Sequence, residues 1–344
     1  MLERLAEALE MPIAWDDPGN GRGARVDTAE VYLRFAVREV REHSPAYENL
    51  ARGIAADARL LALIDDLPPI KRQPNLLLAS VRFLGGPVAD FAPFRSWVVG
   101  HWAEVRDTIL TRRTQTNEVG RCASLLPVLA GLTQPLALIE VGASAGLCLY
   151  PDRYRYHYDD LPAVGPADSP VVLACRTNGK VPVPGRVPEV VWRAGLDLNP
   201  LDVRDEEEMR WLECLVWPGQ DERLLRLRGA VRVAREDPPH LVRGDLNETL
   251  RDLVALAPEE ATVVVFHSAV LPYLEPEARD RFVSAVRSLP VRWISNEGSP
   301  RLPSMLARLE HGLPEDRLAF LPALDGEPVA MAGPHGEWLD WLDA

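Results

Sequence analysis

The chain has 344 residues, with 38 lysines and arginines against 51 aspartates and glutamates, which gives a formal net charge of −13. This acidic balance disfavours nucleic acid and other polyanions as partners. No stretch approaches the roughly 18 to 20 apolar residues that a membrane span requires. The amphipathic segment at residues 1–12 carries too many charges for a secretory signal. We therefore expect a cytoplasmic protein that does not enter a membrane.

The four cysteines, Cys122, Cys148, Cys175 and Cys214, are scattered along the chain. Their spacing matches neither a zinc-binding pattern nor a disulfide framework. Free thiols are typical of a reducing compartment, which agrees with a cytoplasmic location. The sequence therefore gives no reason to expect a metal site.

Residues 1–130 show mainly helical patterns. Asp27 and Glu30 have the spacing of a capping box, and Ser44-Pro45 ends the helix that follows. Further apolar, helix-forming stretches lie at residues 51–67, 74–84 and 91–111. The sequence predicts an all-helical N-terminal domain over residues 1–130, which would cap the rest of the protein.

From residue 136 onward, strand and helix patterns alternate, which predicts a parallel sheet with helices on both faces. The predicted strands cover residues 136–141, 190–196, 240–242, 261–266 and 291–295. The predicted helices cover residues 206–216, 222–234 and 277–289. We expect one α/β domain over residues 131–344, with a β-rich insertion at about residues 152–188, where Tyr154, Tyr156 and Tyr158 alternate with polar residues.

Two apolar runs near the end of the chain, residues 318–324 and 328–332, flank Asp325-Gly326. An Asp-Gly pair between two apolar runs is a strong signal for a hairpin. The sequence therefore predicts that the sheet ends in an antiparallel hairpin.

The segment LALIEVGASAGL at residues 136–147 carries the most chemical information. Its pattern predicts a buried strand, a tight turn of small residues and the start of a helix. Gly142 and Gly146 let the backbone approach a ligand closely, and the amides that open the helix would face it. Glu140 would offer acceptors to hydroxyls or to an amine at the end of the strand. These features suit a nucleoside-bearing cofactor at the edge of an open α/β sheet.

The spacing of the glycines indicates which cofactor to expect. A dinucleotide fingerprint reads G-x-G-x-x-G, but Ser144 stands at its middle glycine, so the pattern here is E-x-G-x-x-x-G. This pattern resembles the first motif of class I S-adenosylmethionine-dependent methyltransferases. The resemblance implies S-adenosylmethionine as cofactor and a Rossmann-like, mostly parallel, doubly wound sheet that ends in an antiparallel strand. It places Glu140, Gly142, Ser144 and Gly146 at the cofactor.

The same resemblance implies two further acidic contacts to the cofactor. Asp197 stands where the ribose ligand is expected, although about 50 residues separate it from the glycine turn instead of about 20. Asp159 and Asp160 are alternative ribose ligands. Asp245 matches the residue that binds the adenine amino group. Helix capping or turn formation is the structural alternative for both Asp197 and Asp245.

Candidate catalytic residues follow the fourth predicted strand of the sheet. His267 is the candidate general base, because the ordinary pKa of histidine lies near 6.5, and Tyr273 could line the acceptor pocket. A satisfied histidine at a strand end is the structural alternative. Asn296 and Glu297, after the fifth predicted strand, are weaker pocket candidates.

A polar run lies immediately before the first strand. Its members Gln115, Thr116, Asn117 and Arg121 are candidate ligands for the substrate or for the methionine carboxylate. A polar linker in which Asn117 caps a helix is the structural alternative.

Several sequence blocks together resemble domain-of-unknown-function family 2332 of bacteria. They are RTQTNEVGR, EVGASAGL, DRYRY, GLDLNPLDV and LVWPGQ, which lie within residues 113–220. The likeness extends over nearly the whole chain. It implies a methyltransferase-like fold with a helical N-terminal region, and it supplies no substrate.

The sequence thus predicts a methyltransferase that uses S-adenosylmethionine and acts on a small molecule. A catalytically inactive module that binds a nucleoside for sensing is the first alternative. A dehydrogenase is disfavoured by Ser144. A serine hydrolase is a further alternative, because residues 142–146 also fit G-x-S-x-G.

Overall fold

The computed structural model describes residues 27–115, 117–298, 309 and 318–342. The described residues form two compact units. The first contains residues 27–115 and 206–224, and the second contains residues 117–205 together with the described part of 225–342.

All secondary-structure elements in the described residues of the first unit are helices or single helical turns. Its elements are α2 (Thr28–Arg34), the π-helix η1 (Phe35–Glu39), α3 (Pro45–Ala56), α4 (Ala58–Asp65), the 3₁₀ turn η2 (Pro69–Lys71), α5 (Pro74–Phe83), α6 (Phe91–Gly100), α7 (Trp102–Thr111) and α9 (Glu206–Leu215). The side chains of Asp27, Ser44 and Asp57 accept hydrogen bonds from amides in the first turns of α2, α3 and α4. Short polar caps and apolar faces therefore explain why this region is helical.

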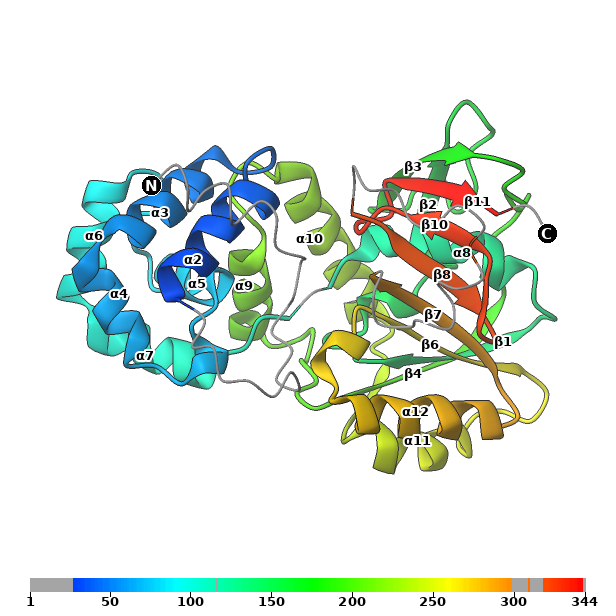
Figure 1. Cartoon of the computed structure of the whole chain (residues 1–344). Coiled ribbons are helices and arrows are strands. Elements are labelled where there is room, and N and C mark those ends of the chain that lie inside the picture. Colours follow the sequence, from blue (N-terminus) through cyan, green and yellow to red (C-terminus); the bar gives the residue numbers. More distant parts are fainter. Residues whose placement is uncertain (1–26, 116, 299–308, 310–317, 343–344) are drawn as a thin grey trace. The chain divides into compact units, whose positions relative to one another are not determined.

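The second unit is built on a sheet whose central part is parallel (Figure 1). In the order β5-β4-β1-β6-β7 the parallel strands are β5 (His240–Arg243), β4 (Val190–Asp197), β1 (Leu136–Val141), β6 (Thr262–Ser268) and β7 (Arg292–Gly298). Beyond β7 follow β8 (Phe320–Leu324), β10 (Ala330–Ala332), β11 (Trp338–Trp341), β3 (Val172–Asn178) and β2 (Arg155–Tyr158). β8, β10 and β11 pair antiparallel to their predecessors. The prediction of an α/β protein with a mostly parallel central sheet is confirmed.

Helices α11 (Leu246–Val254) and α12 (Pro276–Ser288) lie together on one face of the sheet, as Figure 1 shows. The apolar core beneath them includes Ile139, Val141 and Val265 from the strands and Phe282 from α12. α8 (Cys122–Ala130) packs against β3 and β8. α10 (Asp221–Glu236) begins in the first unit and continues into the second.

The hairpin expected at Asp325-Gly326 is present. β8 pairs antiparallel with β9 (Glu327–Pro328), and the turn residues Asp325 and Gly326 have φ angles of 54° and 90°. Positive φ at both turn positions is what a two-residue hairpin of type I′ requires, and Asp-Gly supplies it at little cost.

The α-helix expected after the glycine turn is not formed. Between β1 and β4 the chain contains only the 3₁₀ turn η4 (Leu147–Leu149) and the strands β2 and β3. Pro151 lies two residues after this turn, and a proline disfavours helical geometry in the residue before it, here Tyr150. The tyrosines at 154, 156 and 158 are buried, and their hydroxyls donate to the carbonyls of Leu147, Pro151 and Ala123. The chain therefore continues into the distant β2–β3 part of the sheet instead of a crossover helix.

The two units do not follow the chain order that the sequence suggests. α8 lies in the second unit, although it precedes residue 130, and α9 lies in the first. Trp211 and Cys214 of α9 belong to the apolar core of the first unit, where Trp211 Nε1 donates to the carbonyl of Arg113 at 2.9 Å. A helix that returns to an earlier domain cannot be recognised from its own amphipathic pattern.

Candidate functional site

The strand order reverses at β1 in the centre of the parallel sheet. From β1 the chain adds β4 and β5 on one side and then β6 and β7 on the other. In open α/β sheets, ligands bind outside the carboxyl ends of the strands at such a switch point. A ligand-binding site is therefore expected among the residues at the carboxyl ends of β1, β4, β6 and β7.

The glycine turn after β1 packs tightly against other parts of the second unit. Gly142 and Gly146 have φ angles of 73° and 69°, as their positions in the turn require. A Cβ added to Gly142 would lie 2.4 Å from Cγ2 of Val270, and one added to Gly146 would lie 2.9 Å from Cγ of Pro239. Side chains of the protein thus occupy the space that the missing Cβ atoms leave open.

Ser144 is held on three sides within this turn. Its amide donates to Oδ2 of Asp197 at 2.8 Å, its hydroxyl accepts from Nδ2 of Asn117 at 2.7 Å, and its carbonyl accepts from the amide of Leu201 at 3.0 Å. Its φ angle of 50° is unusual for a residue with a side chain. These contacts compensate for the unfavourable backbone conformation.

Asp197 and Asn117 join the turn after β1 to neighbouring segments. Asp197 also accepts from the amide of Asn199 at 2.7 Å, so both of its oxygens bond backbone amides. Asn117 accepts from the amide of Ala145 at 3.2 Å while it donates to Ser144. The structure thus brings together one predicted substrate ligand and two predicted cofactor ligands. Their described contacts are to one another and to the backbone.

The other acidic candidates lie at different places. Asp245 is the N-cap of α11 and accepts from the amide of Asn247 at 2.8 Å. Asp159 accepts from the amide of Thr177 at 3.0 Å in the β2–β3 part of the sheet, and Asp160 is exposed. The capping alternative predicted for Asp245 is therefore present in the structure.

Glu140, the penultimate residue of β1, is a buried carboxyl group with an open acceptor. Its side chain is 7% exposed, and Oε2 has no hydrogen-bond partner among the described residues. Burial raises the pKa of Glu140 well above its ordinary value, with further upward contributions from Cys148 and Asp197, while Arg121 acts in the opposite direction. A ligand that donates a hydrogen bond or carries positive charge would stabilise this group.

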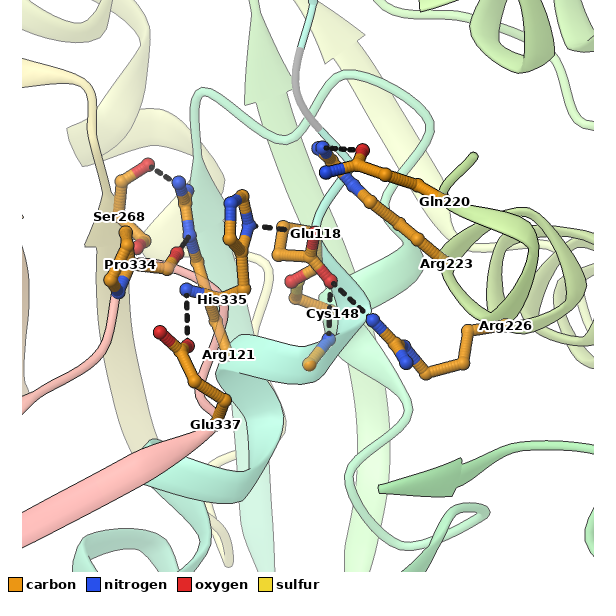
Figure 2. A network of polar contacts seen from close by, with 11 residues as sticks. Glu118, Arg121, Cys148, Gln220, Arg223, Arg226, Ser268, Pro334, His335 and Glu337 are labelled. Carbon is orange, nitrogen blue, oxygen red and sulfur yellow. Dashed lines mark hydrogen bonds and ion pairs between the residues drawn. The ribbon is translucent and has the colours of Figure 1, made fainter. Parts of the chain in front are cut away.

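Figure 2 shows a polar network that includes Arg121 and Cys148, two residues that influence the pKa of Glu140. The buried Glu118 contacts Nδ1 of His335 at 3.0 Å and lies 4.0 Å from Nη2 of Arg226. Arg121 donates through Nε to the carbonyl of Pro334 at 2.9 Å and through Nη1 to that of Ser268 at 3.3 Å. Arg121, predicted as a substrate ligand, thus lies at the carboxyl end of β6.

His267 lies in the core beneath α12. Its Nε2 accepts from Nε1 of Trp293 at 3.1 Å, so the ring proton is on Nδ1, which contacts Oε1 of Glu297 at 2.6 Å. The ring is fully buried and meets Phe282 edge to face. Both nitrogens therefore have partners inside the protein, and a role as general base stays a prediction that would require one of these contacts to open.

The remaining candidates are dispersed. Tyr273 ends the 3₁₀ turn η5 (Leu271–Tyr273) and is 70% exposed. Gln115 belongs to the first unit, while Thr116 lies outside the described residues. Trp293 as the partner of His267 was not found from the sequence, since only the register between β6 and β7 brings the two together.

The described part of the chain contains neither a cluster of metal-binding side chains nor a membrane-spanning helix. No group of three or more histidine, cysteine, aspartate or glutamate side chains is placed there to hold a metal ion. None of the helices within the described ranges has the length and apolar character needed to traverse a bilayer.

Residues 29–341 match a family described as an uncharacterized protein conserved in bacteria, DUF2332. The match covers most of the chain, and the protein therefore belongs to this family. No curated protein and no solved structure matches the chain.

Proposed function

We propose that the protein binds S-adenosylmethionine at the carboxyl ends of β1 and β4 and transfers its methyl group to a small molecule. The observation that carries this proposal is the buried carboxyl group of Glu140, whose Oε2 has no partner among the described residues. Glu140 is the penultimate residue of β1, the middle one of the five parallel strands, where the strand order reverses. A buried polar group without a partner requires an explanation, and at the switch point of an open α/β sheet a bound ligand supplies one.

The order of the strands supports a class I methyltransferase-like sheet. Five parallel strands in the order β5-β4-β1-β6-β7 are followed by the antiparallel β8. The sequence motif E-x-G-x-x-x-G ends β1 at the centre of this arrangement. Fold and motif thus favour the same edge of the sheet.

The residues present fit an adenosyl group in one respect and restrict it in another. Glu140 offers an acceptor to a ribose hydroxyl or an amine. Gly142 and Gly146, however, already pack against Val270 and Pro239, and Asp197 already bonds two amides. We therefore propose that Glu140 makes the main polar contact to the adenosyl group. The glycine turn then holds the end of β1, and with it Glu140, in place.

Bound S-adenosylmethionine supplies an electrophilic methyl group. The protein's contribution is then to hold the acceptor in line and to exclude water, which lowers the barrier without a dedicated base for many nucleophiles. A mechanism by positioning agrees with the enclosed state of His267, since both ring nitrogens are bonded within the core.

A nucleoside-binding module without catalysis is the second candidate. The enclosure of His267 favours it, because the sequence offered this residue as the general base. The serine hydrolase alternative loses support, since the hydroxyl of Ser144 accepts a hydrogen bond from Asn117 and not from a histidine.

Calorimetric titration of the full chain tests the binding step. S-adenosylmethionine and its demethylated product should bind, and NAD and ATP should not. A ligand at 100 times its dissociation constant should stabilise the protein by about 2.7 kcal/mol. Glu140→Gln should weaken binding, whereas Glu39→Gln, which changes a partly buried carboxyl group of the first unit with a raised pKa, should not. Absence of binding by both sulfonium ligand and product would refute the proposal.

Turnover separates the two candidates. Release of the demethylated product in the presence of a panel of small acceptors would identify an enzyme. Tight binding without release by any acceptor in the panel would favour the sensing module.

A further inference from the structure

Three polar residues lie on one face of the sheet, at the ends of three adjacent parallel strands. In the register, Glu140 of β1 pairs with Phe266 of β6, and Ser268 of β6 pairs with Asn296 of β7. Side chains along a strand alternate between the two faces, and register partners in neighbouring strands share a face. Glu140, Ser268 and Asn296 therefore share one face, and His267 lies on the other.

Two hydrogen-bond acceptors on this face have no partner in the described residues. They are Oε2 of Glu140 and Oδ1 of Asn296, and both atoms are buried. Asn296 itself is fully buried, and its Nδ2 donates to Oγ of Ser268 at 3.0 Å. Leaving two buried acceptors unbonded costs free energy, so their occurrence on one face points to a ligand that donates to both.

Arg121 extends along the same edge. Its Nη1 donates to the carbonyl of Ser268 at 3.3 Å, and its guanidinium lies 4.9 Å from the ring centre of Phe320. Because Phe320 pairs with Gly298, it belongs to the face that carries Asn296. Arg121 also acts on the carboxyl group of Glu140. Arg121 thus interacts with both strand ends: it donates a hydrogen bond to Ser268 of β6, and its charge favours the ionised form of Glu140 in β1.

We propose that Glu140 and Asn296 together bind a primary amine of a small molecule. The two residues are two strands apart and two positions apart along the sheet, which places their Cα atoms roughly 12 Å from one another. A glutamate, an asparagine and one nitrogen between them can bridge that span. A primary amine carries enough N–H donors for both acceptors. The inference does not rest on the proposed function: Oε2 of Glu140 is the oxygen assigned there to the cofactor, so the amine and S-adenosylmethionine would compete for it.

The charge of the surroundings favours an amine over a neutral hydroxyl. The carboxyl group of Glu140 is buried, and burial together with the nearby Cys148 and Asp197 opposes its ionisation more than Arg121 favours it. A bound ammonium group would compensate the carboxylate and reduce this penalty. A hydroxyl can donate only one hydrogen bond and would leave one of the two acceptors without a partner.

Saturation-transfer NMR on the full chain tests the site with methylammonium chloride as probe. Tetramethylammonium chloride has the same charge but no N–H donor, and methanol has a single O–H donor. We expect a signal from methylammonium that exceeds both. Glu140→Gln and Asn296→Leu should each weaken binding by about tenfold or more. Asn247→Leu is the matched control, because Asn247 also has a buried Oδ1 without a partner but lies on α11.

The outcomes distinguish this inference from the proposed function. Equal signals from methylammonium and tetramethylammonium, or unchanged binding in both site variants, would refute the amine site even if S-adenosylmethionine binds. Selective amine binding without affinity for S-adenosylmethionine would refute the proposed function and leave the amine site intact. If both assignments hold, methylammonium and S-adenosylmethionine should displace one another, because both use Oε2 of Glu140. Simultaneous binding of the two, with S-adenosylmethionine binding lost in Glu140→Gln, would refute the amine site.

Discussion

Replacement of Gly142 by alanine is expected to destabilise the second unit by about 1–4 kcal/mol. The φ angle of 73° costs an alanine about 1–2 kcal/mol, and the new Cβ at 2.4 Å from Cγ2 of Val270 adds an overpacking cost of about 1–3 kcal/mol. The reduced freedom of the unfolded chain returns about 0.4–1 kcal/mol. Denaturant unfolding of the full chain, followed in the transition of the second unit, measures the difference.

Alanine substitutions at two other glycines measure the backbone cost and the unfolded-state gain without the steric cost. Gly85 has a φ angle of 80° and no atom within 4 Å of an added Cβ, so Gly85→Ala should cost only about 0–1.5 kcal/mol. Gly185 has neither the positive φ nor a close neighbour, so Gly185→Ala should be neutral or stabilising by up to about 1 kcal/mol.

A double-mutant cycle with Val270→Ala isolates the steric part. Since Val270→Ala removes the methyl group in the way, Gly142→Ala should cost about 1–3 kcal/mol less in that background. Additivity of the two substitutions within about 0.5 kcal/mol would refute the reasoning. It would mean that Gly142 faces open space, as a close approach to a ligand requires, and not a packed side chain.

Other substitutions test the polar contacts of the second unit by denaturant unfolding. Asn117→Ala removes the contacts to Ser144 and Ala145 at 2.7 and 3.2 Å and should cost about 1–3 kcal/mol; a cost near zero would show that the turn holds itself. Trp293→Phe removes the only donor described for Nε2 of His267 and should cost about 1–3 kcal/mol; an unchanged stability would contradict the enclosed histidine. Because the pKa of Glu140 is raised in the folded state, the folded protein keeps a proton that the unfolded chain loses, and stability should fall as pH rises above the ordinary carboxyl range. Glu140→Gln should remove that part of the pH dependence, and an identical pH profile in this variant would show that folding does not raise the pKa of Glu140.

The positions of the central strands could be predicted from the sequence because their composition leaves few alternatives. The run ATVVVF and the run LALIEV are short, apolar and bounded by turn residues, and they form β6 and β1 within one or two residues of the expected bounds. The hairpin was equally predictable, since Asp325-Gly326 has a specific backbone preference.

The segment after the glycine turn could not be predicted in the same way. Leu147 and Leu149 fit the start of an amphipathic helix, but both are fully buried in a single 3₁₀ turn. The conformation of this segment is determined by tertiary contacts, such as the hydrogen bond that the hydroxyl of Tyr154 donates to the carbonyl of Leu147 at 2.5 Å. Tertiary contacts of this kind override the local pattern, and a single sequence does not reveal them.

The roles of the site residues depend on register, which the sequence does not state. Each strand end offers a polar residue to either face, and a shift by one position exchanges the faces. The sequence singled out His267 at the end of β6 and not Ser268, yet the pairing of β6 with β7 brings His267 to Trp293 in the core and Ser268 to Asn296 on the face of Glu140.

The two buried carboxyl groups at this edge of the sheet have different surroundings. Oε1 of Glu297 contacts His267 at 2.6 Å and accepts from the amides of Val270 and Leu271 at 3.0 and 3.4 Å, so this oxygen has several partners within the face covered by α12, while Oε2 has none among the described residues. Glu140 lies on the other face, where burial and nearby acidic groups oppose its ionisation. A ligand gains free energy by supplying what a site lacks. The chemistry of this protein is therefore expected on the Glu140 face, with His267 and Glu297 supporting the strand ends from behind.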